Sequence, residues 1–430
     1  GGIVGGTAEL ASLTVDGGGT TLLNAGTVTT AGVQSYTDAV TLGADTALVT
    51  TNSNVSFTST LNSSEALATA GTPAPATLSI TAGSGDVTFG GIVGGAAYSA
   101  TATNGALGAV TLVSAKDVGI NAAFTAASLT QQAGAGSGTT TIGGATTLTG
   151  ALGFTGGNLV VNAAVGAGGA VSFTGSALTV NAAVATGGAV TVANTGTFTT
   201  SANGDINATG AFTQSGAGSN SLAGDVTSGG NIALAGATVL TGDVAIVTAN
   251  ASGTIDLSGV NSNGSGAAKN LLLKSPGALT IDAAIGNTQP LGTIWIEAAG
   301  VSQGVQTAGT DGPIISGSGF AVKAAKLAIT SSGLVDLIHP DNIVPLLAAS
   351  ISGNAGYRFT NYSSNGVTID TITNPFDANV SLAGLKASGA TNTSSASFVV
   401  GGLLTQTAGA VIDLGGNFTV NAQPNTLKDV

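Results

Sequence analysis

A short phrase that returns at a fixed spacing is the feature that most constrains the fold of this chain. LVVNAAV at residues 159–165 recurs as LTVNAAV at residues 178–184, which is 19 positions later. Related phrases carry a polar residue at the same place, and these residues serve as markers of phase: Asn121, Asn162, Asn181, Asp282 and Asn421. Their spacings of 41, 19, 101 and 139 residues fit multiples of about 20. A motif that keeps its phase in this way predicts a solenoid with about 20 residues in each coil.

The repeated unit has the pattern of a β-strand. Triplets such as LTV, VTL, VSF and LTI place apolar residues on either side of a hydroxyl residue, with a period of two. The β-branched residues Val, Ile and Thr suit that geometry, and the Gly-rich pairs between the triplets are typical of turns. We therefore expect an all-β protein, a right-handed parallel β-helix in which each coil pairs with the coil before it.

The alternation also predicts which side chains face the core. The apolar members of the triplets are expected inside: Val161, Phe173, Val180, Val190 and Ile281. The hydroxyl members are expected to face solvent: Ser172, Thr179 and Thr280. A shift of the register by one residue would exchange the two sets.

Composition is consistent with a folded, exported chain. Hydrophobic residues make up 43% of the 430 residues and charged residues only 7%, which is too apolar for a disordered chain. Cysteine is absent, so no disulfide framework is expected. No apolar run approaches the roughly 18 residues of a membrane-spanning helix. The net charge is −12, and since a nucleic-acid surface would be basic, nucleic acid is not an expected partner.

The repeat pattern along the sequence predicts three parts. Residues 1–330 are interpreted as a β-helix rod, residues 331–375 as an irregular excursion with a loop or short helix, and residues 376–430 as a continuation of the β-helix. The middle part contains LVDLIHPDNIVPLLAASI at residues 334–351, where the apolar residues do not alternate strictly and two prolines interrupt the pattern.

Three Gly-Asp pairs repeat near the coil period and form a candidate site. Asp205, Asp225 and Asp243 are spaced by 20 and 18 residues, so on adjacent coils their carboxylates would lie about 5 Å apart. Ca²⁺ takes carboxylate oxygens, and the two carboxyl groups of a retaining glycosidase lie at about that distance. No calcium-binding nonapeptide repeat accompanies them. We interpret them first as turn residues, with weak Ca²⁺ binding as the second hypothesis and catalysis as the third.

Other polar residues are expected to be structural. Asn162 and Asn181 are interpreted as a corner, because asparagine tolerates positive φ and stacked amides bond from coil to coil. The single histidine, His339, lies near Asp336 and Asp341 without a nucleophile or arginine partner in sequence, and we interpret it as a solvated loop residue. Zinc, phosphate-loop and dinucleotide motifs are absent from the sequence. No cofactor is therefore expected apart from possible Ca²⁺.

Several longer segments of the sequence resemble the repeats of a known class of proteins. They are SLTVDGGGTTLLNAGTVTTAG (12–32), YTDAVTLGADTALVTTNSNVSFTSTL (36–61), VTFGGIVGG (87–95), LTQQAGAG (129–136), FTQSGAG (212–218) and LTQTAGAVI (404–412). These phrases resemble the repeats of large bacterial surface proteins of the filamentous haemagglutinin type. The resemblance covers residues 1–330 and 376–430. It implies a parallel β-helix rod, export from a Gram-negative-type bacterium to the cell surface or medium, and a role in adhesion or in a biofilm matrix.

The function expected from these observations is that of a structural and adhesive rod segment without catalysis. Its expected partners are copies of itself, in axial or lateral contact, and glycans of a host or matrix. Two alternatives stay open: a repeating subunit of a homopolymeric extracellular filament, and a carbohydrate-active β-helix. Because the hexapeptide GGIVGG at residues 1–6 recurs at residues 90–95, we expect the amino-terminal edge to continue into more β-helix, from a parent chain or a neighbouring copy.

Overall fold

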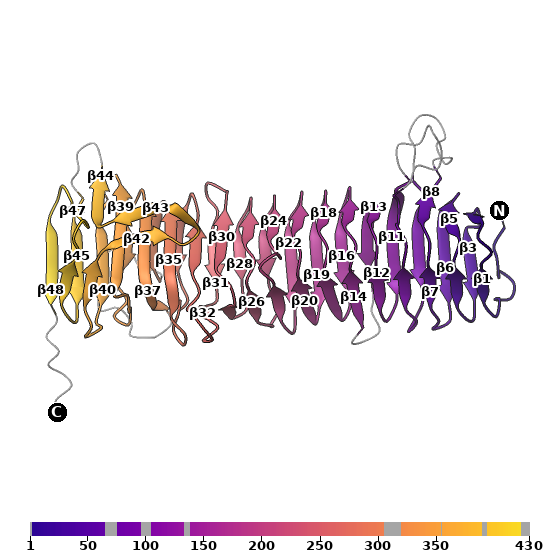
Figure 1. Cartoon of the computed structure of the whole chain (residues 1–430), viewed down its shortest axis with the longest axis horizontal. Helices are drawn as coiled ribbons and strands as arrows, with labels where there is room; N and C mark the ends of the chain where they lie inside the picture. The colour runs from indigo at the N-terminus through magenta and orange to yellow at the C-terminus, as the bar shows by residue number, and fades with distance from the viewer. Residues whose placement is uncertain are drawn as a thin grey trace, which may run out of the picture. The chain divides into compact units, whose positions relative to one another are not determined.

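The fold is a parallel β-solenoid. The computed structural model describes residues 2–64, 75–95, 105–132, 138–304, 320–353, 355–388 and 394–422. The chain forms two compact units, Gly1–Thr209 with Gly216–Gly218, and Gly210–Ser215 with Ser219–Val430. Figure 1 shows the strands of each unit stacked side by side. The chain makes about 16 turns of roughly 22 residues. The described residues contain no α-helix, and therefore no helix that could cross a membrane.

The strands of the first unit are, in chain order, β1 (Leu13–Val15), β2 (Thr20–Leu23), β3 (Thr27–Thr30), β4 (Gln34–Tyr36), β5 (Ala39–Leu42), β6 (Thr46–Thr50), β7 (Val55–Phe57), β8 (Leu61–Ser63), β9 (Leu78–Thr81), β10 (Val87–Phe89), β11 (Leu107–Ser114), β12 (Val118–Ile120), β13 (Phe124–Gln131), β14 (Thr139–Ile142), β15 (Thr146–Leu148), β16 (Leu152–Thr155), β17 (Asn158–Val161), β18 (Val165–Ala167), β19 (Val171–Gly175), β20 (Ala177–Val180), β21 (Val184–Thr186), β22 (Val190–Asn194), β23 (Phe198–Thr200) and β24 (Ile206–Ala208).

The strands of the second unit are β25 (Phe212–Gln214), β26 (Asn220–Leu222), β27 (Val226–Ser228), β28 (Ile232–Leu234), β29 (Thr238–Leu240), β30 (Val244–Thr248), β31 (Ile255–Leu257), β32 (Val260–Ser262), β33 (Leu271–Lys274), β34 (Ala278–Ile281), β35 (Leu291–Ala298), β36 (Gly300–Gln303), β37 (Ala324–Ser331), β38 (Val335–Leu337), β39 (Leu346–Ser352), β40 (Tyr357–Asn361), β41 (Val367–Ile369), β42 (Thr371–Asn374), β43 (Asp377–Ala383), β44 (Leu385–Ser388), β45 (Ala396–Val400), β46 (Leu404–Gln406), β47 (Ile412–Asp413) and β48 (Phe418–Ala422).

Three strands make up each coil in the middle of the first unit. One coil consists of β17, β18 and β19, and the next of β20, β21 and β22. The strands pair in parallel, with Leu159 opposite Leu178 and Val165 opposite Val184. The phrases LVVNAAV and LTVNAAV therefore lie on neighbouring coils in the register that the sequence predicts, and the predicted parallel β-solenoid is confirmed.

The corners explain why the period is longer than the expected 20 residues. The paired residues Leu159 and Leu178 are 19 positions apart, whereas the paired residues Val244 and Leu271 are 27 positions apart. Strand pairing needs only that the strands return to register, so a corner accepts extra residues while the ladder continues. The phase therefore drifts along the chain. Asn162 and Asn181 follow β17 and β20, which belong to one ladder, whereas Asp282 follows β34, which belongs to the separate ladder β34–β36–β38–β40–β45–β48. Asp282 therefore does not occupy the same place in its coil as the two asparagines.

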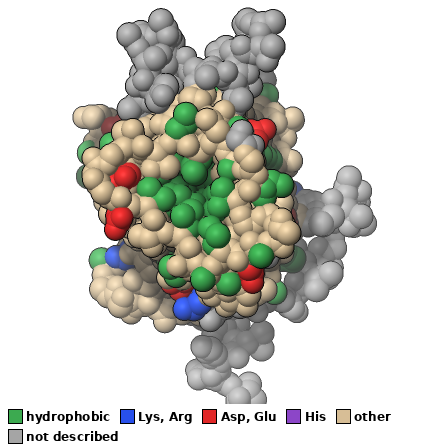
Figure 2. Space-filling model, turned by 90° about the vertical axis from the view of Figure 1, so that its right-hand side faces the viewer, with side chains coloured by type: hydrophobic (Ala, Val, Ile, Leu, Met, Phe, Trp, Pro, Cys, Tyr) green, Lys and Arg blue, Asp and Glu red, His purple; other side chains and the backbone are tan. Residues whose placement is uncertain are grey.

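The interior of the coils is the hydrophobic core. All five apolar residues predicted to face inward are at most 4% exposed, while Ser172 and Thr280 are exposed and Thr179 is intermediate. The predicted register is thus confirmed. Phe173 stacks on Phe154 of the preceding coil, with ring centroids 5.2 Å apart and planes 5° apart. Figure 2, which views the first unit from the end of its first coil, shows hydrophobic side chains gathered at the centre of that face.

The glycine that follows the valine has the same backbone conformation in both copies of the hexapeptide GGIVGG. Gly5 and Gly94 have φ values of 73° and 68°, in the left-handed region that favours glycine. Val4 forms a parallel bridge to one neighbouring coil and Val93 forms bridges to two. Val4 is 36% exposed and Val93 is 1% exposed. A second flanking coil thus accounts for the burial of the internal copy.

The segment predicted as an irregular excursion, residues 331–375, contains strands of the solenoid ladders. β38 pairs in parallel with β36 and β40, and β39 pairs in parallel with β37. The strands of this segment continue the ladders up to Ile369, and its loop, at residues 338–345, contains no helix. The chain leaves the ladders slightly later, at β42 and β43, which form an antiparallel hairpin.

Replacing Phe173 by Ala should lower the stability of the solenoid by about 3–5 kcal/mol, because the change leaves a cavity in the core next to Phe154. Ser172→Ala, on the outward side of the same strand, should change it by less than about 0.5 kcal/mol. Urea unfolding followed by circular dichroism measures both. Equal losses for the two variants would contradict the register.

Candidate functional site

Asp and Asn side chains at the corners accept hydrogen bonds from the backbone of the next coil. In the first unit Asn54 Oδ1 accepts from the Asp86 N–H at 2.8 Å, Asp86 Oδ1 from the Asp117 N–H at 3.3 Å, and Asp117 Oδ1 from the Thr139 N–H at 2.7 Å. Hydrogen bonding by Thr139, together with Lys116 at 3.1 Å from the carboxylate, holds the pKa of Asp117 below its usual value. The side chains extend the hydrogen-bond ladder to positions where the chain turns.

The candidate carboxylates of the second unit have the same role. Asp225 Oδ1 accepts from the Ala245 N–H at 2.7 Å, and the two oxygens of Asp243 accept from the backbone and side-chain nitrogens of Asn270 at 2.9 and 2.8 Å. The pairing of β27 with β30 sets Val226 opposite Ile246. Asp225 therefore lies opposite Ala245 and not opposite Asp243, so the expected direct stacking of these two carboxylates is wrong.

The third candidate, Asp205, lies in the first unit, where its backbone oxygen accepts from the Val184 N–H at 2.9 Å. Among the described residues, no three or more His, Cys, Asp or Glu side chains gather as a metal would require. The turn interpretation of Asp225 and Asp243 agrees with their contacts. Binding of Ca²⁺ at Asp205, Asp225 and Asp243 stays a prediction.

The asparagine corner is confirmed for one of its two expected reasons, the hydrogen bond between stacked amides. Asn181 Nδ2 donates to Asn162 Oδ1 at 2.8 Å, so the two amides bond from coil to coil. Neither residue has positive φ; among the described residues only Asn52 combines a side chain with positive φ, at 54°. The amide ladder, and not a left-handed backbone, accounts for asparagine here.

His339 is buried, so its interpretation as a solvated residue is wrong. It is 2% exposed. Its backbone N–H donates to Gln303 Oε1 at 3.0 Å, and its Nδ1 accepts from the Asp341 N–H at 3.2 Å. The amides of Gln303 and Asn342 also bond to each other, at 2.8 and 3.1 Å. These buried polar side chains supply hydrogen-bond partners for backbone N–H groups of the loop of residues 338–345.

Asp336 and Arg358 form an ion pair on adjacent strands β38 and β40. The Asp336 side chain is 2% exposed and that of Arg358 is 41% exposed. One carboxylate oxygen, Oδ1, is buried without a hydrogen-bond partner. Burial raises the pKa of Asp336, against the opposing effect of Arg358.

An apolar row on the outer face of the second unit was missed by the sequence analysis. Register places Leu272, Trp295, Ala328 and Ala348 side by side on β33, β35, β37 and β39. Trp295 is 1% exposed although its neighbours Ile294 and Ile296 already occupy the interior. The hairpin β42–β43 covers this row (Figure 1). The signal in the sequence was the loss of strict alternation in TIWIEA and LLAAS, which marks strands buried on both faces.

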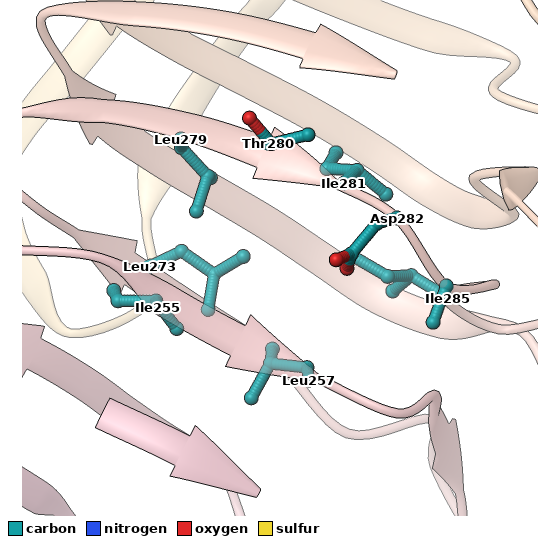
Figure 3. A pocket seen from close by; sticks show the side chains of 9 residues that line it. Ile255, Leu257, Leu273, Leu279, Thr280, Ile281, Asp282 and Ile285 are labelled. Carbon is teal, nitrogen blue, oxygen red and sulfur yellow. The ribbon is translucent and has the colours of Figure 1, made fainter. Parts of the chain in front are cut away.

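A small cavity beside β34 cannot hold a ligand. It has a volume of about 10 Å³, which is the space of roughly one water molecule. Figure 3 shows Ile255, Leu257, Leu273 and Leu279 around it, with the carboxylate of Asp282 at its side. Partial burial and the charge of Asp256 raise the pKa of Asp282.

A shallow groove of about 430 Å³ on the first unit has a lining free of titratable side chains. Its lining comprises Thr147, Leu148, Gly166, Ala167, Ala185, Thr186, Gly187, Asn207, Ala208 and Thr209. General acid–base catalysis needs a titratable group within hydrogen-bond reach of the substrate. This groove can therefore offer shape and hydroxyl groups to a glycan, but no acid.

Comparison with known proteins adds no identity. No family model, curated protein or solved structure matches the chain.

Replacing Asp243 by Ala should lower stability by about 1 kcal/mol, because the Asn270 backbone N–H and side chain lose their acceptor. Asp243→Asn keeps one acceptor oxygen and should cost less. Asp256→Ala, at an exposed position of β31, is the matched control and should stay within about 0.5 kcal/mol. Thermal unfolding with and without Ca²⁺ compares them. A Ca²⁺-dependent rise in the wild type, lost on changing Asp205, Asp225 and Asp243 to Asn, would establish a calcium site instead.

The Asp336→Asn variant should gain stability relative to the wild type as pH rises. A carboxyl group whose pKa is raised by folding binds its proton more tightly in the folded than in the unfolded chain. The wild type therefore loses stability as pH rises from the ordinary pKa of Asp through the raised value. The amide lacks this dependence, and the half-exposed Arg358 stays solvated. Unfolding midpoints at about pH 3.5 and about pH 7 test this; a variant that weakens relative to the wild type as pH rises would contradict it.

Proposed function

We propose that this chain is a structural and adhesive segment of a large secreted bacterial surface protein, similar in type to filamentous haemagglutinin, and that it works without catalysis. The observation that carries the proposal is the use of its polar residues. Asn54, Asp86 and Asp117 bond from coil to coil, and so do Asp225 and Asp243. In an enzyme such carboxylate and amide side chains would contact substrate, whereas here they bond to the backbone of the neighbouring coil.

The outward side chains support an adhesive role. In the first unit one row runs through Thr14, Ser35, Ser56 and Thr88 on four successive strands. Hydroxyl groups repeat along such a row at the strand spacing of about 4.8 Å. A surface of this kind offers many weak, identical hydrogen bonds to a polymer with its own repeat. The partner class we propose is therefore a polysaccharide, bound through several coils at once.

The composition supports lateral contact between copies as well. Residues 118–204 contain no charged side chain, so long-range repulsion between the walls of neighbouring molecules is weak. This feature fits a matrix component that lies against its own kind. It also sets the proposal apart from an enzyme for anionic sugars, which needs basic side chains beside its acids.

The test incubates the purified chain with a panel of insoluble and soluble polysaccharides and measures two quantities, co-sedimentation and release of reducing ends. We expect co-sedimentation with at least one polymer and reducing ends at background, in the wild type and in the variant with Asp205, Asp225 and Asp243 changed to Asn. Hydrolysis by the wild type that this variant loses would overturn the proposal in favour of a carbohydrate-active enzyme. Absence of binding to every polymer would remove the adhesive part.

A further inference from the structure

The hairpin β42–β43 is an insertion into one strand of a coil. β41 and β44 both pair with β39, the first at Leu346 and Leu347 and the second from Ala349 onward. The chain leaves the ladder after Ile369, which pairs with Leu347, and rejoins it at Leu385, which pairs with Ala349. On β39 only Ala348 separates these two pairs, and Gly384 lies opposite it. At its base the Asp370 N–H donates to Leu347 O at 3.0 Å, and the Ala349 N–H donates to Gly384 O at 2.9 Å. The parallel ladder thus closes around the point where the hairpin departs.

The base of the hairpin is itself hydrogen-bonded. The Gly384 N–H donates to Asp370 O at 2.9 Å, and Asp370 Oδ1 accepts from the Thr371 N–H at 2.8 Å and from the hydroxyl of Thr407 at 2.6 Å. Gly384 has φ of 83°, a conformation that favours glycine. These contacts fix the two ends of the insertion to the coil independently of the hairpin's outer part.

Two apolar side chains of the hairpin's outer part pack on the sheet. Ile372 and Leu382 lie opposite each other in the hairpin and pack on the outer apolar stripe, which we define as Leu272, Trp295, Ala328, Leu346 and Ala348. Ile372 is 1% exposed, whereas Val380 of the same hairpin is 40% exposed. Other hydrogen bonds run within the hairpin, as from Ser381 Oγ to Thr373 Oγ1 at 3.0 Å.

The strands beneath the hairpin are held by backbone hydrogen bonds on both sides and by core packing. β37 forms backbone ladders with β35 on one side and β39 on the other, and Leu327 and Ile329 are fully buried in the interior. A two-stranded hairpin has little stability of its own in water. Regions with few buried contacts open locally, while cores open only on global unfolding.

We propose that β42–β43 is a hinged cover, which lifts from the outer apolar stripe as a unit while the parallel ladders beneath it stay formed. Lifting exposes Trp295 and its neighbours, which then form an apolar surface on the outer face of β33, β35, β37 and β39. The scaffold proposed above does not require this cover. The inference therefore concerns conformational control of one surface, and it stands or falls separately from adhesion.

Hydrogen exchange and tryptophan fluorescence test the cover, since Trp295 is the only tryptophan of the chain. We expect the amides of residues 371–383 to exchange at least about tenfold faster than those of β37. Ile372→Ala should increase both that exchange and the quenching of Trp295 by acrylamide at least about tenfold, as truncation of a buried Ile weakens its packing. Val380→Ala, at the exposed site, should leave both unchanged.

A second variant guards against misfolding of the first. Removing residues 370–383 joins Ile369 to Gly384, which restores one residue opposite Ala348. We expect this chain to keep the circular dichroism of the wild type, to bind the apolar dye anilinonaphthalene sulfonate, and to show a red-shifted Trp295 emission. Loss of the β-sheet signal in the excised chain would overturn the proposal. So would loss of protection in β37 and the hairpin together in Ile372→Ala, because either result makes the hairpin part of one cooperative unit.

Discussion

Parallel backbone pairing between successive coils is the interaction on which the rest of the structure depends. Each strand both donates to and accepts from the strand on either side of it, so all of its backbone groups are paired only when a coil lies between two coils. Side chains act within that constraint: apolar residues fill the interior, and Asn or Asp oxygens serve the corner amides that the strands do not reach. The identical hexapeptide at Val4 and Val93 illustrates the point, because one additional flanking coil separates a 36% exposed valine from a 1% exposed one.

The sequence predicts the strands and their register because both depend on local alternation. Leu159 and Leu178 pair as the repeated phrase requires, and Val161 and Phe173 are buried as their triplets indicate. Coil length is less predictable, since a corner can lengthen without disturbing the ladder. For that reason a motif-based phase holds between Asn162 and Asn181 but fails at Asp282, which follows a strand of a different ladder.

The candidate site was predicted least well, because its chemistry depends on long-range contacts. Spacing alone suggested that Asp225 and Asp243 would stack, yet the pairing of β27 with β30 is offset by two residues from that alignment. The loss of alternation near residues 334–351 predicts a departure from the solenoid. The alternation is lost for another reason: the strands around Trp295 and Ala348 stay in the solenoid and are buried on both faces, because a hairpin from later in the chain covers their outer side.

The direction of the inter-coil hydrogen bonds has a mechanical consequence. Because these bonds point along the stacking direction and the terminal coil has only one neighbour, a pull on one end of the chain breaks the bonds of that coil before those of the inner coils. Such a stack yields by peeling, one coil after another, and each detached coil of roughly 22 residues releases about 75 Å of extended chain. A stack that yields in this way lengthens in small increments under load and keeps most of its coils folded.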